Sequence, residues 1–383
     1  MADRSIAVFT GSRAEYGLLR HLIAALKTEP GILLQLIVSG SHLSERLGNT
    51  LIEIVADGIE PAALVPLSLD KTPQPSMAAL TAEALEGVSQ CLERLQPELL
   101  ILLGDRYEVF AAAAAAHLQC IPVVHIHGGE TTEGAIDDRL RHSISQLSTW
   151  HFTSAESHRQ RVIAMGHPPE RVLNVGPMVL DGLLMASSAS KSNFEELTGY
   201  RFGKSNLLVT YHSETLLDNR GLAGFEALLQ ALEQIPCNVL FTYPNSDSGS
   251  DQLLLKLNTF LASYQKRCWV VKSLGQKCYL EALQLFDAMA GNSSSGLIEA
   301  PLLGMPVLNI GSRQLGRFCY GPVCHVPSEY IAIFNGLKQV LAFGSEVDRS
   351  RSFPIKQSSP AKMITSWLRG HLRDNITNSE QSS

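Results

Sequence analysis

Acidic side chains follow two apolar runs in the first half of the chain, at the points where those runs end. Asp105 follows the run 99–103, and Glu130 follows the run 122–127 after two glycines. At the ends of neighbouring parallel strands, which lie about 5 Å apart, two carboxylates can share proton-transfer work. Taken singly, Asp105 also fits a helix N-cap and Glu130 a solvated loop residue.

A further acidic pair, Asp137 and Asp138, opens a segment of helical period. Either aspartate can cap this helix, and a catalytic role is about equally consistent with the pattern. Arg141 lies three to four residues further along the same helical face. It is a candidate substrate-binding residue, and it can equally hold one of the aspartates charged in an ion pair.

Residues suited to bind an anion lie at the strand ends of the second half. His212 follows the run 207–211 and is a candidate acid, base or phosphate donor. The turn 291–296 offers backbone N–H groups and the N-terminal end of a following helix, which suit a phosphate, although a serine run also serves simply as a helix cap. The candidate phosphate contacts in this turn are Ser293, Ser294, Ser295 and Gly296.

Arginines in two other loops can supply countercharge. Arg13 follows the first apolar run, and Arg313 lies in the loop 311–317, which we expect beside the serine turn. The loop at Arg13 lacks both the G-x-G-x-x-G spacing and the P-loop lysine, which argues against NAD or ATP binding by those routes.

Apolar runs alternate with amphipathic segments along most of the chain, which indicates an α/β fold with parallel sheets covered by helices. A stretch of small and polar residues interrupts this alternation. The expected parts are an N-terminal Rossmann-like domain (1–185), a linker (186–205), a C-terminal Rossmann-like domain (206–359), a terminal helix (360–373) and a disordered tail (374–383). Strand-end loops of two such domains would face each other, so we expect the site in an interdomain cleft.

Composition narrows the classes of function. The 383 residues are 45% hydrophobic and 18% charged, with a net charge of −6, which argues against nucleic-acid binding. No apolar run is long enough for a signal peptide or a membrane span. Seven scattered cysteines favour reduced thiols in a cytoplasmic protein, and no motif for a metal or a cofactor is present.

Six motifs in order resemble those of the hydrolysing UDP-N-acetylglucosamine 2-epimerases, the branch that feeds sialic and legionaminic acid synthesis. They occupy residues 10–17, 103–108, 125–130, 136–144, 291–299 and 309–316. The resemblance implies a GT-B-like fold of two Rossmann-type domains. It also implies elimination of UDP across C1 and C2, followed by hydration of the 2-acetamidoglucal to N-acetylmannosamine.

The resemblance also implies roles for individual residues. The catalytic positions of the family correspond in this chain to Asp105, Glu130, one aspartate of the pair Asp137 and Asp138, and His212. Positions that bind UDP match Ser293, Ser294, Glu299 and Arg313, and Arg13 lies in the motif that contacts the nucleotide sugar. One departure is Ser213, where family members often have proline.

Three alternatives stay open at this point. The same chemistry could act on UDP-N,N'-diacetylbacillosamine; the chain could be a GT-B glycosyltransferase that uses a UDP-sugar; or it could be a nucleotide-sugar sensor without activity. The expected partners are a UDP-sugar and its UDP product, with neither nucleic acid nor membrane, and the resemblance suggests a homo-oligomer, a dimer or tetramer.

Overall fold

The computed structural model describes residues 4–73, 75–131, 136–185, 189–214, 221–243, 250–272, 274–346 and 358–380. The chain divides into two compact units: Met1–Leu184 together with Gln357–Ser383, and Met185–Lys356. They are called unit 1 and unit 2 here. The sequence also suggests sugar contacts in the loop 131–134 and a turn-rich loop at 244–250; residues 132–135 and 244–249 lie outside the described residues.

Unit 1 is built on a sheet of seven parallel strands in the order β3-β2-β1-β4-β5-β6-β7. The strands are β1 (Arg4–Thr10), β2 (Ile32–Ser39), β3 (Ala63–Val65), β4 (Leu99–Leu103), β5 (Val123–Ile126), β6 (Trp150–Thr153) and β7 (Val172–Asn174). The helices are α1 (Arg13–Thr28), α2 (Leu51–Ala56), α3 (Met77–Leu95), α4 (Tyr107–Leu118), α5 (Ile136–Leu147), α6 (Glu156–Ala164), α7 (Val179–Met185) and α14 (Pro360–Glu380).

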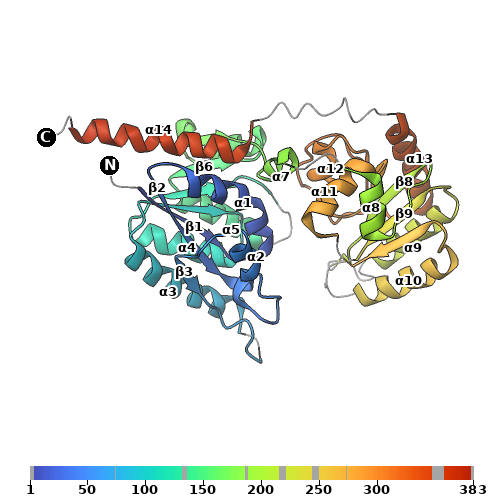
Figure 1. The fold of residues 1–383 in the computed structure, drawn as a ribbon, viewed down its shortest axis with the longest axis horizontal. Coiled ribbons are helices and arrows are strands. Elements are labelled where there is room, and N and C mark those ends of the chain that lie inside the picture. Colours follow the sequence, from blue (N-terminus) through green and yellow to red (C-terminus); the bar gives the residue numbers. More distant parts are fainter. Residues whose placement is uncertain are drawn as a thin grey trace. The chain divides into compact units, whose positions relative to one another are not determined.

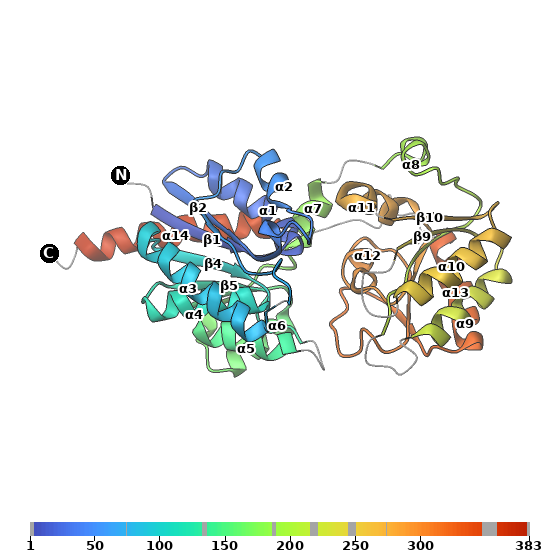
Figure 2. The ribbon, with the colours of Figure 1, turned by 90° about the horizontal axis from the view of Figure 1, so that it is seen from below.

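Both faces of this sheet are buried, and alternate residues of each strand face opposite sides. In β1, Ile6 and Val8 belong to the core under α1 and α14, whereas Ala7 and Phe9 belong to the core under α3, α4 and α5 (Figure 2). The alanine run 111–116 lies within α4 and is largely buried, as the sequence predicts for a closely packed helix.

Unit 2 has six parallel strands in the order β10-β9-β8-β11-β12-β13. The strands are β8 (Asn206–Thr210), β9 (Asn238–Thr242), β10 (Cys268–Val271), β11 (Ala288–Gly291), β12 (Val307–Ile310) and β13 (Cys324–Val326). The helices are α8 (Lys191–Thr198), α9 (Leu222–Glu233), α10 (Ser250–Ser263), α11 (Gly275–Leu285), α12 (Glu299–Leu302) and α13 (Tyr330–Glu346) (Figure 1). Counted within the unit, this is the 3-2-1-4-5-6 order of the Rossmann fold.

The structure differs from the sequence-based expectation in two helices and two strands. The expected linker contains helix α8, and the C-terminal helix α14 continues to Glu380, past the residue 373 at which the sequence analysis ended it. The short edge strands β3 and β13 were not predicted, whereas β7, which is equally short, was.

The strand order reverses between β1 and β4 in unit 1, and between β8 and β11 in unit 2. At such a reversal the chain leaves neighbouring strands toward opposite faces of the sheet, so the loops separate at the carboxyl ends and leave room for a ligand. These two openings, and the adjacent end of β5, position the candidate site residues.

Helix α14 returns from unit 2 and packs on unit 1 beside α1 (Figure 1). Its buried face includes Ile364 and Leu368, and Trp367 packs edge-on against Trp150 at 4.8 Å between ring centroids. All seven cysteines are free thiols. Among the helices of the described residues, none has the length and apolar composition needed to cross a membrane.

The carboxylate of Asp181 anchors the start of α14. It accepts hydrogen bonds from the Ser359 hydroxyl and from the Ala361 backbone N–H, the latter at 2.9 Å. We predict that Asp181→Ala lowers the free energy of unfolding of unit 1 by about 1–3 kcal/mol, because a buried cap is lost. Urea denaturation followed by tryptophan fluorescence measures this.

Ser359→Ala removes one of these hydrogen bonds and also the bond of 3.1 Å that the Ser359 hydroxyl accepts from the Lys362 N–H, so it should destabilise unit 1 by a similar amount. Glu156→Ala is the control, because Glu156 forms an exposed ion pair with Arg159 that contributes little. Equal effects of Asp181→Ala and Glu156→Ala would contradict the anchoring role.

Candidate active site

The strands that precede Asp105 and Glu130 are neighbours in the sheet of unit 1. Strand β4 pairs with β5 in parallel, with Leu103 opposite Ile126. Both loops therefore leave the same carboxyl edge of the sheet, as expected from the sequence, and the two acidic residues follow adjacent strand ends.

Asp105 binds an arginine and does not cap a helix. Arg106 is the N-cap residue of α4, and the Asp105 carboxylate instead accepts a hydrogen bond from Nη2 of Arg141 in α5. The N-cap interpretation of Asp105 was therefore wrong. Burial raises the pKa of Asp105, although the charge of Arg141 opposes this rise.

The aspartate pair lies in the first turn of α5, which begins at Ile136. Oδ1 of Asp138 lies 3.9 Å from Nη1 of Arg141, so the same guanidinium contacts both Asp138 and Asp105. The side chain of Arg141 is only 8% exposed. The structure thus contains the ion pair that the spacing allowed, and it buries the charge of Arg141 against two candidate catalytic groups.

Glu130 is held in its charged form. Its Oε1 accepts a hydrogen bond of 2.6 Å from the Ser154 hydroxyl and lies 3.4 Å from Nδ1 of His127. Burial disfavours the charge of Glu130, but His127, Arg141 and Ser154 together outweigh burial and lower its pKa. The pKa values of Asp105 and Glu130 are therefore shifted in opposite directions, as in sites that divide acid and base roles between two carboxyls.

His127 reaches Glu130 from an unusual backbone conformation. Its φ is +67°, a left-handed value that non-glycine residues seldom adopt. Its Nε2 accepts a hydrogen bond of 3.1 Å from the Met178 backbone N–H, which leaves the proton of the neutral ring on Nδ1, facing Glu130. Burial lowers the pKa of His127 and favours this neutral form.

His125 has the buried, hydrogen-bonded role that the sequence suggests. Its Nε2 lies 2.8 Å from the carbonyl oxygen of Gly104, and its Nδ1 lies 3.0 Å from the Ser145 hydroxyl. Burial lowers the pKa of His125 to about 4, so it is neutral and joins the end of β4 to α5.

The opening between β1 and β4 is filled by two glutamates and an arginine that were not predicted as site residues. Nε and Nη2 of Arg106 donate to the two carboxylate oxygens of Glu108 at 3.2 and 3.0 Å. Oε1 of Glu15 lies 3.6 Å from Nε of Arg106, and its Oε2 accepts a hydrogen bond of 2.7 Å from the Gly11 N–H. Burial raises the pKa of Glu15 to about 7.

Arg13 lies at the surface, as the first residue of α1 after the N-cap Ser12. Its side chain is 63% exposed, and its Nε lies 3.1 Å from Glu53. This is a weak, solvent-screened ion pair, so the guanidinium can exchange Glu53 for a ligand at little cost.

In unit 2, Asn292 joins the ends of β8 and β11. Its side chain accepts a hydrogen bond of 2.7 Å from the His212 N–H and donates one of 2.9 Å to the His212 carbonyl. Asn292 is fully buried, and the His212 residue is 7% exposed. This reciprocal pair fixes the backbone of His212, and Asn292 was missed because only the fold brings residues 80 positions apart together.

The serine turn is tighter than the helix start that the sequence suggested. Residues Ser294–Gly296 form one 3₁₀ turn, and α12 is only four residues long. The N–H groups of Ser295, Gly296 and Leu297 are used within the turn. Within the described chain, the N–H groups of Ser293 and Ser294 have no acceptor, so these two amides, rather than a helix dipole, are available to an anion.

Ser295 points inward and supports Glu299. The Tyr279 hydroxyl in α11 donates a hydrogen bond of 2.6 Å to Ser295 Oγ, and Ser295 in turn stabilises the Glu299 carboxylate. Burial nevertheless raises the pKa of Glu299. Gly296 packs against β12, where an added Cβ would lie 3.1 Å from a methyl group of Val307. Ser295 and Gly296 thus have structural contacts, and Tyr279 was missed.

Arg313 and its neighbour Gln314 both contact the loop after β11. Nη1 of Arg313 donates to the Asn292 carbonyl at 3.2 Å, and Nε2 of Gln314 donates to the same oxygen at 2.8 Å. The expectation that this loop lies beside the serine turn is therefore correct, since the turn follows Asn292 directly.

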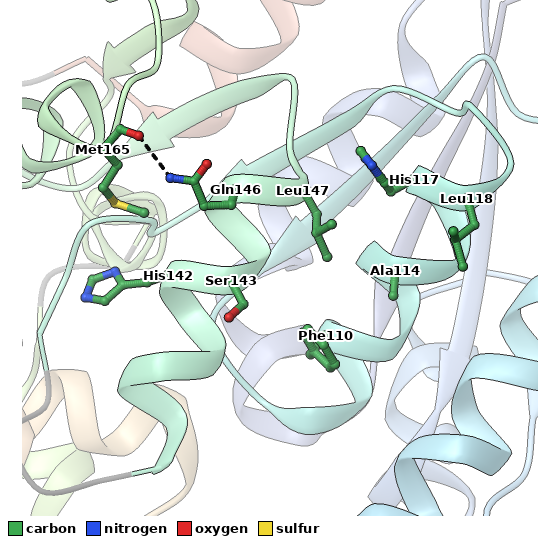
Figure 3. A pocket seen from close by; sticks show the side chains of 9 residues that line it. All are labelled: Phe110, Ala114, His117, Leu118, His142, Ser143, Gln146, Leu147 and Met165. Atoms are coloured by element: carbon green, nitrogen blue, oxygen red, sulfur yellow. Dashed lines mark hydrogen bonds between the residues drawn. The ribbon is translucent and has the colours of Figure 1, made fainter.

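An apolar groove of about 630 Å³ lies away from these strand ends, between α4 and α5 (Figure 3). Phe110, Ala114 and Leu118 line it from α4. None of the predicted site residues lines it, although Nε2 of the lining residue His142 lies 3.7 Å from Asp138. The groove is therefore not the candidate active site.

The family described as UDP-N-acetylglucosamine 2-epimerase matches residues 24–366 of this chain. The chain belongs to this family. It is 35% identical over 338 residues to the UDP-N,N'-diacetylbacillosamine 2-epimerase (hydrolyzing) of Legionella pneumophila, a match that covers 88% of this chain and 89% of the relative. It is 30% identical over 343 residues to the UDP-N-acetylglucosamine 2-epimerase of Neisseria meningitidis serogroup B, a match that covers 89% of this chain and 88% of the relative.

A further family member, the GDP/UDP-N,N'-diacetylbacillosamine 2-epimerase (hydrolyzing) of Campylobacter jejuni, is 34% identical and covers 83% of each chain. The chain described here is therefore an enzyme of the hydrolysing 2-epimerase type. The crystal structure of the Neisseria meningitidis UDP-GlcNAc 2-epimerase bound to UDP-GlcNAc superposes with a TM-score of 0.79 at 19% identity, covering 96% of this chain and 100% of the other. The crystal structure of a UDP-N-acetylglucosamine 2-epimerase homologue from Listeria monocytogenes superposes with a TM-score of 0.78 at 17% identity, covering 98% of each chain. These likenesses confirm the GT-B-like fold class.

The shifted pKa of Glu15 predicts how the stability of this 2-epimerase depends on pH. Because the folded state holds the proton of Glu15 more tightly than the unfolded state, the stabilisation is present below pH 4.5 and is lost as pH rises through about 7. The shift corresponds to about 3 kcal/mol. Glu15→Gln keeps an acceptor for the Gly11 N–H and does not ionise.

We therefore expect the wild-type protein to lose stability relative to Glu15→Gln between pH 4.5 and 8, as measured by chemical denaturation at a series of pH values. Parallel pH profiles for the two proteins would show that Glu15 does not titrate in this range.

Proposed function

We propose that this enzyme hydrolyses UDP-N-acetylglucosamine to N-acetylmannosamine and UDP, with inversion at C2. The observation that carries the proposal is the pair of carboxyls Asp105 and Glu130 at adjacent strand ends, with pKa values shifted in opposite directions. Family membership supports it.

The chemistry explains why such a pair is needed. The hydrogen on C2 of the sugar is not next to a carbonyl, so a base alone removes it with difficulty. When the C1–O bond breaks and its electron pair leaves with UDP, C1 gains oxocarbenium character, and this makes C2–H acidic. One carboxylate that stays charged beside C1 and a second carboxylate that accepts the C2 proton would lower both barriers.

We assign the charged role to Glu130, because its environment favours ionisation, and the C2 proton transfer to Asp105, whose raised pKa makes it the stronger base. The product of this elimination is the 2-acetamidoglucal. Water then adds its hydroxyl group to C1, and a proton returns to C2.

Inversion requires that this second proton arrive on the opposite face of C2 from the one that left. A second acid is therefore needed, and we assign it to the aspartate pair Asp137 and Asp138 at the start of α5. Arg141, buried between Asp138 and Asp105, would limit the repulsion between these groups, which we favour over a direct contact with substrate.

The diphosphate is assigned to unit 2. The amides of Ser293 and Ser294, together with Arg313 and His212, supply donors for an anion near the end of β11. The Glu299 carboxylate, positioned by Ser295, can accept hydrogen bonds from ribose hydroxyls. In unit 1, Arg13 is an exposed cation in a loop that follows a strand end, and we assign it to the nucleotide sugar.

UDP-N,N'-diacetylbacillosamine is the second candidate substrate. The Legionella pneumophila and Campylobacter jejuni relatives, which are named for this sugar, are 35% and 34% identical to the chain. The chemistry at C1 and C2 would be the same, because the two sugars differ at C4 and C6.

Incubation of each substrate in deuterated water, followed by NMR, tests the proposal. We expect release of UDP and a free sugar that is inverted at C2 and carries deuterium there, because the returning proton comes from solvent-exchanged carboxyls. Release of UDP without inversion would overturn the proposal. Transfer of the sugar to an acceptor without C2 exchange would instead indicate a glycosyltransferase.

Replacing either carboxyl group by its amide should slow turnover. We expect Asp105→Asn and Glu130→Gln to fold normally and to lose at least about 100-fold in kcat, the usual effect of losing a general acid or base. Steady-state release of UDP measures this, and Glu156→Gln on the surface of α6 is the matched control. Near-native rates in both site variants would show that the carboxylate assignment is wrong.

A further inference from the structure

A chain of hydrogen bonds continues from Glu130 beyond Ser154. The Ser154 hydroxyl, which donates to Oε1 of Glu130 at 2.6 Å, also lies 2.9 Å from Nδ1 of His158. Ser154 follows β6, and His158 lies in the first turn of α6. Both residues are buried, with 2% and 3% of their surface exposed. The three side chains thus connect the carboxyl edge of the sheet with the start of α6.

The single proton of the Ser154 hydroxyl fixes the direction of both hydrogen bonds. Because this proton is donated to Glu130, Ser154 Oγ faces His158 with a lone pair, and Nδ1 of His158 must be the donor. Burial lowers the pKa of His158 to about 4. The charges of Arg161 and Arg141 act in the same direction, and that of Glu130 opposes them. Near neutral pH the ring therefore carries one proton, and the contact with Ser154 places it on Nδ1.

A chain with this direction stabilises a negative charge and does not transport a proton. If Ser154 passed its proton to Glu130 and took the one on Nδ1 in exchange, His158 would become an imidazolate, which is too basic to form near neutral pH. The hydrogen bond from His158 instead polarises the hydroxyl and strengthens its bond to the carboxylate. The chain therefore favours the charged form of Glu130.

The loop that carries Glu130 is also held on α6 by its backbone. Nη1 of Arg161 donates to the Gly129 carbonyl oxygen. Gly129 has a φ of +81°, and a Cβ there would lie 2.4 Å from the His158 carbonyl oxygen, so the loop and the helix are in close contact. This packing sets the distance between Glu130 and the two residues of the chain.

Other groups also act on the charge of Glu130. Burial opposes this charge, whereas His127, 3.4 Å from Oε1, and Arg141 in α5 favour it. Asp105, after β4, repels it. Arg141 also pairs with Asp105, whereas Ser154 contacts Glu130 alone among the candidate catalytic carboxyls of the described residues. The contact through Ser154 therefore adjusts one carboxyl without the other.

We infer that His158 is a positioning residue, which acts through the Ser154 hydroxyl to hold the Glu130 carboxylate in place and in its charged form. This inference rests on the proposed function, in which Glu130 stays charged beside C1 while UDP leaves. It adds strand β6 and helix α6 to the elements that prepare the site for the reaction.

The pKa of Glu130 tests the chain directly. It is measured by NMR titration of the carboxyl carbon signals in protein isotopically labelled at glutamate, and Glu130→Gln identifies the signal. We expect Ser154→Ala to raise the pKa of Glu130 by about one to two units, because a hydrogen bond to a charged group is lost. His158→Leu keeps the hydroxyl and removes its donor, so it should raise this pKa by less.

Two further variants show whether His158 acts through the hydroxyl. In His158→Asn, the asparagine Nδ2 can replace Nδ1 as the donor to Ser154, so the pKa of Glu130 should stay close to the wild-type value. In the double variant Ser154→Ala with His158→Leu, the pKa should equal that of Ser154→Ala alone. Ser148→Ala is the matched control, because Ser148 is buried before the start of β6 and donates to the Ile144 carbonyl at 2.7 Å.

The pH profile of kcat/KM tests the connection to turnover. Its acid limb contains the ionisations of Asp105, whose pKa is raised by burial, and of Glu130, whose pKa is lowered by its partners against burial. Ser154→Ala should make this limb steeper and move it to higher pH, with little change in kcat on the plateau. A merely structural role would lower the plateau and leave the limb in place.

An unchanged Glu130 pKa in His158→Leu would overturn the inference, as would a double variant whose shift is the sum of the two single shifts. If Ser154→Ala fails to fold, the contrast between His158→Leu and His158→Asn decides, and His158→Ala replaces His158→Leu if that variant fails. A raised pKa with an unmoved acid limb would support the chain but contradict the charged role that the proposed function gives to Glu130. Failure of the whole proposed function is distinguishable, because the wild-type enzyme itself would then release no inverted sugar.

Discussion

The reversal of strand order is the constraint on which both parts of the candidate site depend. In unit 1 the loops after β1 and β4 separate at the carboxyl edge of the sheet, and in unit 2 the loops after β8 and β11 do the same. The polar groups collected at these openings come from distant parts of the sequence. Several of them can be buried there because they find partners on a neighbouring loop, as Glu130 finds Ser154 and Asn292 finds the backbone of His212.

The two openings are equivalent in topology and differ in chemistry. In unit 1, the Glu15 carboxylate accepts the hydrogen bond of the Gly11 N–H, and buried acidic side chains surround the opening between β1 and β4. In unit 2, the uncharged side chains of Asn292 and Gln314 hydrogen-bond to the loops after β8 and β11. The backbone N–H groups of Ser293 and Ser294 remain available as donors within the described residues. One fold used twice thus provides the acidic surroundings to which we assign proton transfer in one unit, and the unused amides to which we assign the diphosphate in the other.

The sequence predicted the strands well because parallel strands covered on both faces are continuous apolar runs, and eleven of the thirteen strands in the described residues coincide with such runs. It predicted Asp105 and Glu130 because residues after such runs reach the carboxyl edge. It could not predict Glu15 or Tyr279 as parts of the site, because each acts through a partner that only tertiary contacts bring near.

Two incorrect predictions, the helix start at the serine turn and the helix cap at Asp105, have causes in the local sequence and its contacts. The serine turn was expected to start a helix, but Ser294–Gly296 closes with contacts three residues apart, since serine and glycine have low helix propensity. Asp105 was considered as a cap, but the charge of Arg141 is a stronger partner than a helix N–H group.

The return of α14 to unit 1 has a consequence for how the chain is made. Unit 1 is discontinuous in sequence: its first 184 residues are synthesised early, and its last helix only after all of unit 2. Until then, the apolar surface of α1 and β6 that α14 covers, including Trp150, is exposed to solvent. On the ribosome, unit 2 can therefore complete its core before unit 1 does, although unit 1 comes first in the chain.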